Sequence, residues 1–143
     1  MSYNNIVVTL DLGDKSEYLA NRAADLAKAL GAKLSFIHID VNYTEIYTGL
    51  IEVNLVDSEA AVVKASTKML QELSNKIDYP VSNILLGRGD LVEELADAIH
   101  ERKFDLVVSG HHHDFWGKLL SNTRHMIHDM PVDLLIVPLH DDQ

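Results

Sequence analysis

Short runs of β-branched and aliphatic residues alternate along this chain with longer segments whose apolar residues recur at helical spacing. The runs predict five strands, at residues 5–10, 33–40, 81–86, 105–109 and 133–137, and the longer segments predict four helices, at residues 15–30, 57–77, 90–103 and 118–129. Strands that alternate with helices form parallel sheets, because each helix carries the chain back across a face of the sheet. With right-handed crossovers, this order predicts an α/β fold: an open, doubly wound, five-stranded parallel sheet with helices on both faces.

Turn and cap residues support these boundaries. Gly31 follows the first predicted helix, where glycine is favoured because a left-handed cap costs it nothing. Pro80 prevents the second helix from continuing. Asp90 and Glu93 stand three residues apart, as in a capping box, and predict the start of the third helix.

Composition excludes several classes of protein. The chain has 143 residues, enough for one domain spanning 1–143, and it has no cysteine, which excludes disulfides, thiolate zinc sites and a thiol nucleophile. The net charge of −10 disfavours nucleic acid and anionic membranes as partners. A leader pattern and an apolar run long enough to cross a bilayer are both missing from the sequence, so we expect a cytoplasmic location.

Residues suited to a ligand site follow the predicted strands. Open parallel sheets bind ligands beyond the carboxyl ends of their strands. In this chain that edge gathers Asp11, Asp40, Gly87, Gly89 and a turn region expected at residues 110–117. The connection at residues 41–56 is longer than most in a compact domain, and such loops often carry function.

Several of these segments together resemble one protein family over nearly the whole chain. Residues 5–11, Asn-Ile-Val-Val-Thr-Leu-Asp, are similar to the opening strand and aspartate of universal stress proteins, and residues 105–112 are similar to their fourth strand and glycine. Residues 40–43, 47–51 and 110–116 resemble the UspA branch of that family. The resemblance implies a Rossmann-like, adenine nucleotide alpha hydrolase-like fold, strand order 3-2-1-4-5, and expression or regulation under starvation and other stress.

The family also supplies a test for ATP binding. ATP-binding members carry, after the fourth strand, a glycine, two residues, a second glycine, nine residues, and then a glycine followed by serine or threonine. In this chain Gly110 matches the first glycine, whereas His113, Thr123 and Arg124 stand at the other three positions. Asp11 matches the family aspartate that lies near the base and ribose.

The substituted positions argue against the ATP mode. Glycine lets backbone N–H groups approach phosphate oxygens and permits positive φ, whereas His113 would fill that space and Thr123 tolerates positive φ poorly. The sequence therefore predicts a degenerate nucleotide site, no cofactor and no enzymatic activity. The alternative is a nucleotide-responsive switch or weak ATPase that uses Asp11, Gly110 and Arg124, because a guanidinium can hold a phosphate in another geometry.

A histidine run invites a metal hypothesis. His111, His112, His113 and Asp114 are ordinary ligand types for zinc or nickel. Three consecutive histidines, however, reach one ion only through an unusual loop, and no other pair with standard ligand spacing accompanies them. We therefore expect a polar loop and no metal site.

The fifth predicted strand indicates how the chain assembles. The resemblance implies a homodimer formed through this strand, which lies at an edge of the implied sheet. A hydrophobic edge with unpaired backbone groups is prone to aggregation unless it is covered or paired. We expect two copies to pair antiparallel through Asp133, Leu134, Leu135, Ile136 and Val137 and the protein to act through contacts with other, unidentified proteins.

Overall fold

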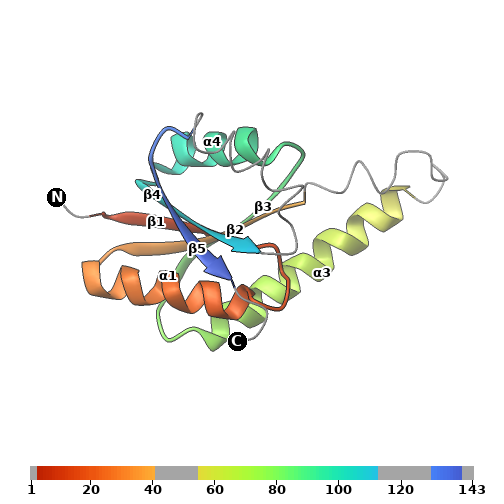
Figure 1. The fold of residues 1–143 in the computed structure, drawn as a ribbon. Helices are drawn as coiled ribbons and strands as arrows, with labels where there is room; N and C mark the ends of the chain where they lie inside the picture. Colours follow the sequence, from red (N-terminus) through yellow and green to blue (C-terminus); the bar gives the residue numbers. More distant parts are fainter. Residues whose placement is uncertain (1–2, 41–54, 113–129, 140–143) are drawn as a thin grey trace.

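The computed structural model describes residues 3–40, 55–112 and 130–139, which form five strands and three helices (Figure 1). In chain order these are β1 (Asn5–Thr9), α1 (Ser16–Leu30), β2 (Lys33–Asp40), α3 (Leu55–Lys76), β3 (Val81–Arg88), α4 (Leu91–Arg102), β4 (Leu106–His112) and β5 (Asp133–Leu139). The helix predicted at residues 118–129 and most of the connection at 41–56 lie outside the described residues.

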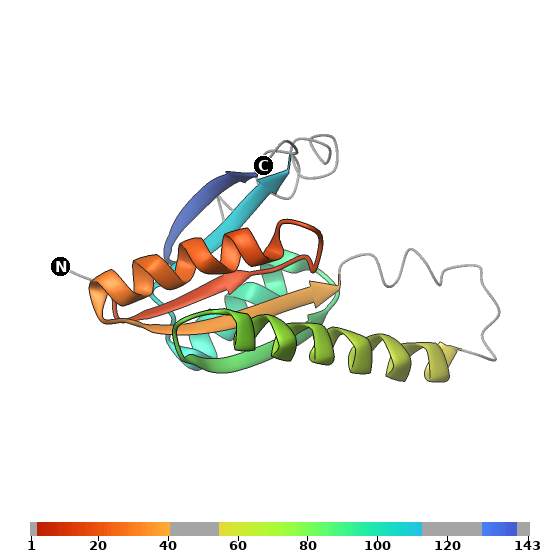
Figure 2. The same ribbon diagram turned by 90° about the horizontal axis from the view of Figure 1, so that it is seen from below.

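The sheet has the predicted topology. All its described pairings are parallel and its order is β3-β2-β1-β4-β5, so β3 and β5 are the two edge strands. Helices α1 and α3 cover one face and α4 covers the other (Figures 1 and 2). The open, doubly wound α/β fold is confirmed, with three helices in the described part of the chain where four were predicted for the whole.

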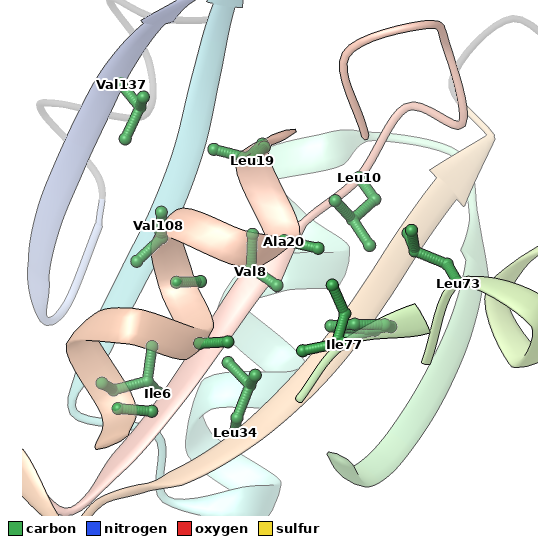
Figure 3. Close-up of a cluster of buried hydrophobic side chains, with 14 of the residues drawn as sticks. Ile6, Val8, Leu10, Leu19, Ala20, Leu34, Leu73, Ile77, Val108 and Val137 are labelled. Atoms are coloured by element: carbon green, nitrogen blue, oxygen red, sulfur yellow. The ribbon is translucent and has the colours of Figure 1, made fainter. Parts of the chain in front are cut away.

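The central strands are buried on both faces, as parallel sheets usually are. Successive β1 residues point to opposite sides, and Ile6, Val7 and Val8 have no exposed surface. Ile6 and Val8 join the core beneath α1 and α3, and Figure 3 shows them in this cluster together with Leu19 and Val108. Val7 belongs to a second core of residues from the sheet, from α4 and from the connection between α4 and β4: Val7, Ile37, Ile39, Leu95, Ile99, Phe104 and Val107.

Three strands run further than the sequence predicts. β3 extends through Gly87 to Arg88, and β4 continues through Gly110 to His112, so the turn expected from residue 110 onward is wrong for its first three residues. The reason is pairing: Gly110 is matched with Val137, and His111 with Pro138, which lengthens β4 and β5 together. Pro138 is tolerated because an edge strand needs N–H donors on one side only.

Two predicted caps are confirmed. Gly31 has φ 66°, in the left-handed region, and the Ala32 N–H donates to Ala27 O at 2.9 Å to close the last turn of α1. At the start of α4, the Asp90 carboxylate accepts the Glu93 N–H at 2.9 Å. This bond satisfies one of the four N–H groups that a helix leaves unpaired at its start.

Removing the Asp90 cap should destabilise the protein. We expect Asp90→Ala to lower the free energy of unfolding by about 1 kcal/mol, whereas Asp90→Asn keeps an acceptor and should lose much less. Urea unfolding of the two variants and the parent measures this difference. Equal losses in both variants would assign the effect to the carboxylate charge, and no loss in Asp90→Ala would show that the cap contributes nothing.

Candidate functional site

The loop after β1 uses Asp11 to hold itself in shape. Asp11 Oδ1 accepts the Gly13 N–H at 2.8 Å and the Ser16 hydroxyl at 3.3 Å. Leu12, between them, has φ 64°, a conformation that costs energy for a residue with a side chain. The carboxylate is exposed at the predicted edge, but one of its oxygens already holds the turn into α1.

Gly110 lies where the core leaves no room for a side chain. A Cβ at this position would stand 2.5 Å from Leu139 Cδ1 and 3.1 Å from Leu19 Cδ2. Both leucines are 3% exposed and belong to the core under α1. The one glycine retained from the ATP-binding pattern is therefore explained by close packing of β4, β5 and α1.

The loop from β3 into α4 is occupied by acidic groups. Gly89 has φ 113°, which favours glycine, and Glu94 Oε2 lies 3.4 Å from where a Cβ of Gly87 would be. Asp90, Glu93 and Glu94 thus bring three carboxylates to the first turn of α4. Anions are favoured at helix N-termini, and here the protein's own carboxylates fill that role.

The start of α1 is also surrounded by acidic residues. Asp11 and Asp14 precede this helix and Glu17 lies in its first turn. Lys15 in the β1–α1 loop and Arg88 at the end of β3 are the basic residues here, and both already interact with other groups. The carboxyl edge is therefore predominantly acidic in the part of the chain that the structure describes, which disfavours a polyphosphate there.

Two polar features of this edge were missed in the sequence. His38 Nδ1 lies 2.6 Å from Leu10 O, so the proton sits on Nδ1 and the ring ties the end of β2 to the end of β1. The Thr9 hydroxyl donates to Ser109 Oγ at 3.1 Å, across β1 and β4. A polar residue within an apolar strand was the available signal for His38 and for the largely buried Ser109.

Other predicted site residues are only partly covered by the structure. His113, Asp114, Thr123 and Arg124 lie outside the described residues. Asp40, His111 and His112 are described through their strand backbone alone: the first ends β2 and the other two end β4. Among the described side chains there is no group of three or more potential metal ligands.

The strand predicted to form the dimer seam, β5, lies at an edge of the sheet. In β5 the side chain of Leu135 is 42% exposed, while Leu134 and Ile136 are half-buried. Val137 is 4% exposed and belongs to the core, so it can meet a partner chiefly through its backbone. Asp133 is exposed and accepts the Tyr3 hydroxyl at 2.6 Å.

This strand order and these strand-end loops define a Rossmann-like α/β protein. Residues 2–138 match the model of the universal stress protein family. The chain is 46% identical to universal stress protein A of Escherichia coli strain K12 over 143 residues, which span all of this chain and 99% of that protein. It is 47% identical to universal stress protein A of Yersinia pestis, over 100% of this chain and 97% of the relative. The chain belongs to the universal stress protein family, which confirms the resemblance seen in its sequence.

Solved structures share the fold. Universal stress protein UspA from Lactobacillus plantarum superposes with a TM-score of 0.69 at 20% identity, covering 96% of this chain and 99% of that one. A universal stress protein in complex with cAMP gives a TM-score of 0.59 at 22% identity, over 96% and 98%. The universal stress protein from Archaeoglobus fulgidus in complex with dAMP gives 0.57 at 18%, over 95% and 98%. At these identities the comparison confirms the fold alone.

The packing at Gly110 can be tested by adding one methyl group. We expect Gly110→Ala to reduce stability by about 1–3 kcal/mol, because the new Cβ overlaps Leu139. Leu139→Ala made alone leaves a cavity and should also destabilise the protein. Combined with Gly110→Ala, it makes room for the new Cβ, so the double variant should be more stable than the sum of the two single losses predicts. Additive losses in denaturant unfolding would show that the two positions do not compete for space.

Proposed function

We propose that this universal stress protein is a dimeric, non-enzymatic protein that acts through protein contacts and does not bind ATP in the mode of the ATP-binding members. The observation that carries the proposal is the packing at Gly110, where Leu19 and Leu139 account for the absence of a side chain. A glycine that the core requires is no evidence for a phosphate. The strand-end loops then serve as a recognition surface for other proteins.

The charge of the carboxyl edge supports the same proposal. Carboxylates surround the starts of both α1 and α4, where a phosphate would otherwise find free N–H groups and a favourable helix dipole. The sequence adds His113, Thr123 and Arg124 at positions where ATP-binding members carry small residues. The carboxylates at the helix starts and the three substituted positions each disfavour binding of a triphosphate.

A second candidate is a nucleotide-responsive switch or weak ATPase. It is favoured by the two family structures in complex with cAMP and with dAMP, which share this fold. In this chain it would use Asp11, Gly110 and Arg124. Asp11 lies exposed at the carboxyl edge, where it already holds the turn at Gly13 and interacts with other groups.

The state of β5 supports dimerisation through that strand. Its backbone is paired with β4 on one side, and the exposed side chain of Leu135 adds apolar surface to the strand. Antiparallel pairing of two copies would satisfy both edges in one closed, self-complementary contact. The proposed site of the protein thus has two parts, the seam and the strand-end loops.

A cytoplasmic location completes this proposal. None of the described helices is long and apolar enough to cross a membrane. Microscopy of a tagged chain in living cells would test the location.

Nucleotide binding separates the two candidates. We expect no measurable heat when millimolar ATP with magnesium is titrated into the protein, and the same for cAMP and dAMP. A dissociation constant in the low micromolar range for any of them would overturn the proposal. Loss of that binding in Arg124→Ala would then establish the nucleotide-responsive alternative.

Light scattering tests the seam. The parent should have twice the mass of the 16.0 kDa chain at tens of micromolar, and Leu135→Asp should shift it toward monomer, because two added carboxylates would meet at the centre of the contact. Leu86→Asp is a matched control, since Leu86 is 38% exposed on β3, the opposite edge strand. A monomeric parent, or dissociation by Leu86→Asp instead, would place the proposal in error.

A further inference from the structure

The segment before β1 is fastened to the starts of two other strands. Asp105, just ahead of β4, accepts the Asn4 N–H at 2.8 Å and the Asn5 N–H at 3.0 Å through its two carboxylate oxygens. One carboxylate therefore fixes two consecutive peptide groups. Because the backbone at Asn4 and Asn5 is held in place, the preceding residue, Tyr3, is also positioned relative to the sheet.

Tyr3, two residues before β1, reaches past β4 to β5. Its hydroxyl donates to Asp133 Oδ2 at 2.6 Å, and its ring packs against the core beneath α1. β1 and β5 are separated by β4, so this contact spans two strand spacings, roughly 10 Å. The Tyr3 side chain thus links the amino-terminal segment directly to the edge strand β5.

The tyrosine remains a hydrogen-bond donor over a wide pH range. The pKa of the Tyr3 phenol is raised, first by the hydrogen bond to Asp133, then by partial desolvation and by the negative charges of Asp133 and Asp105. A phenol whose ordinary pKa is about 10 therefore stays protonated at neutral and mildly alkaline pH. The contact is lost only when the pH rises through the raised value.

Asp133 and Leu135 lie on the same face of β5, because strand residues two apart point the same way. A two-fold axis through the middle of the proposed seam, at Leu135, sets this residue against its own counterpart. The same antiparallel register sets Asp133 opposite Val137 of the second copy. A carboxylate beside an apolar residue at a closing interface loses hydration, and this is costly unless the charge is hydrogen-bonded.

We infer that Tyr3 and Asp133 form part of the surface on which the second copy docks. This inference rests on the proposed dimer and adds to the seam a residue from the other end of the chain. The phenol donates a hydrogen bond to the carboxylate of Asp133, and its ring packs against the core beneath α1. Tyr3 is a positioning residue: it compensates Asp133 so that the strand edges can meet.

The test is a double-mutant cycle on the dissociation constant of the full-length dimer. Tyr3→Phe keeps the ring but leaves Asp133 without its donor, and should weaken the dimer about three- to tenfold. Asp133→Asn removes the charge and keeps an acceptor, so its dimer should be at least as tight as the parent's. The combination of Tyr3→Phe with Asp133→Asn should return to within about twofold of the parent, because no charge remains to be compensated. Sedimentation over nanomolar to micromolar protein gives these constants.

Controls separate docking from folding. Tyr18→Phe, at a tyrosine 39% exposed on α1, should leave the dissociation constant unchanged. Thermal unfolding at high protein concentration should be nearly the same for Tyr3→Phe and the parent, since the fold keeps its other contacts. The inference is overturned if the Tyr3→Phe dimer is as tight as the parent dimer, or if the double variant is as weak as Tyr3→Phe. The proposed seam still stands in that case if Leu135→Asp dissociates the dimer. A monomeric parent would instead defeat the proposed dimer itself.

Discussion

The burial of the central strands on both faces is the constraint on which the rest of this structure depends. Val7 and Val8 point in opposite directions, and neither has exposed surface, because helices cover both sides of the sheet. A sheet covered in this way can meet other molecules only at its strand ends and along its edge strands. In the part of the chain that the structure describes, the acidic carboxyl edge and the edge strands β3 and β5 are therefore where this family member can differ in function from its relatives without altering its core.

A retained glycine has two physical uses in this fold, and they are easily confused. Absence of a Cβ lets a backbone approach a phosphate, and it equally lets neighbouring side chains close over a strand. At Gly110 the second use is visible, since Leu19 and Leu139 occupy the space. Relatives bound to adenine nucleotides share the fold of this chain, but the fold does not carry the phosphate chemistry with it.

Apolar runs and cap residues predicted the five strands, their parallel arrangement and the ends of α1 and α4, because these signals are local. The far ends of β3, β4 and β5 were missed, since Gly87, Gly110 and Pro138 are poor strand formers by themselves and are held extended by their neighbours. The contacts of His38 with Leu10 and of Tyr3 with Asp133 join residues 28 and 130 positions apart. No local pattern encodes them, because they depend on strand order and register.

The position of β1 in the middle of the sheet also governs how the chain must be assembled during synthesis. Ile6 pairs with Leu106, and Tyr3 bonds to Asp133, so one side of the first strand has no partner until most of the protein has left the ribosome. Sheets closed by such distant segments fold slowly, and their open edges are exposed to other chains in the interval. For this protein the hazardous period is the time between translation of β1 and arrival of β4, and a pause or truncation within it would leave an apolar strand uncovered.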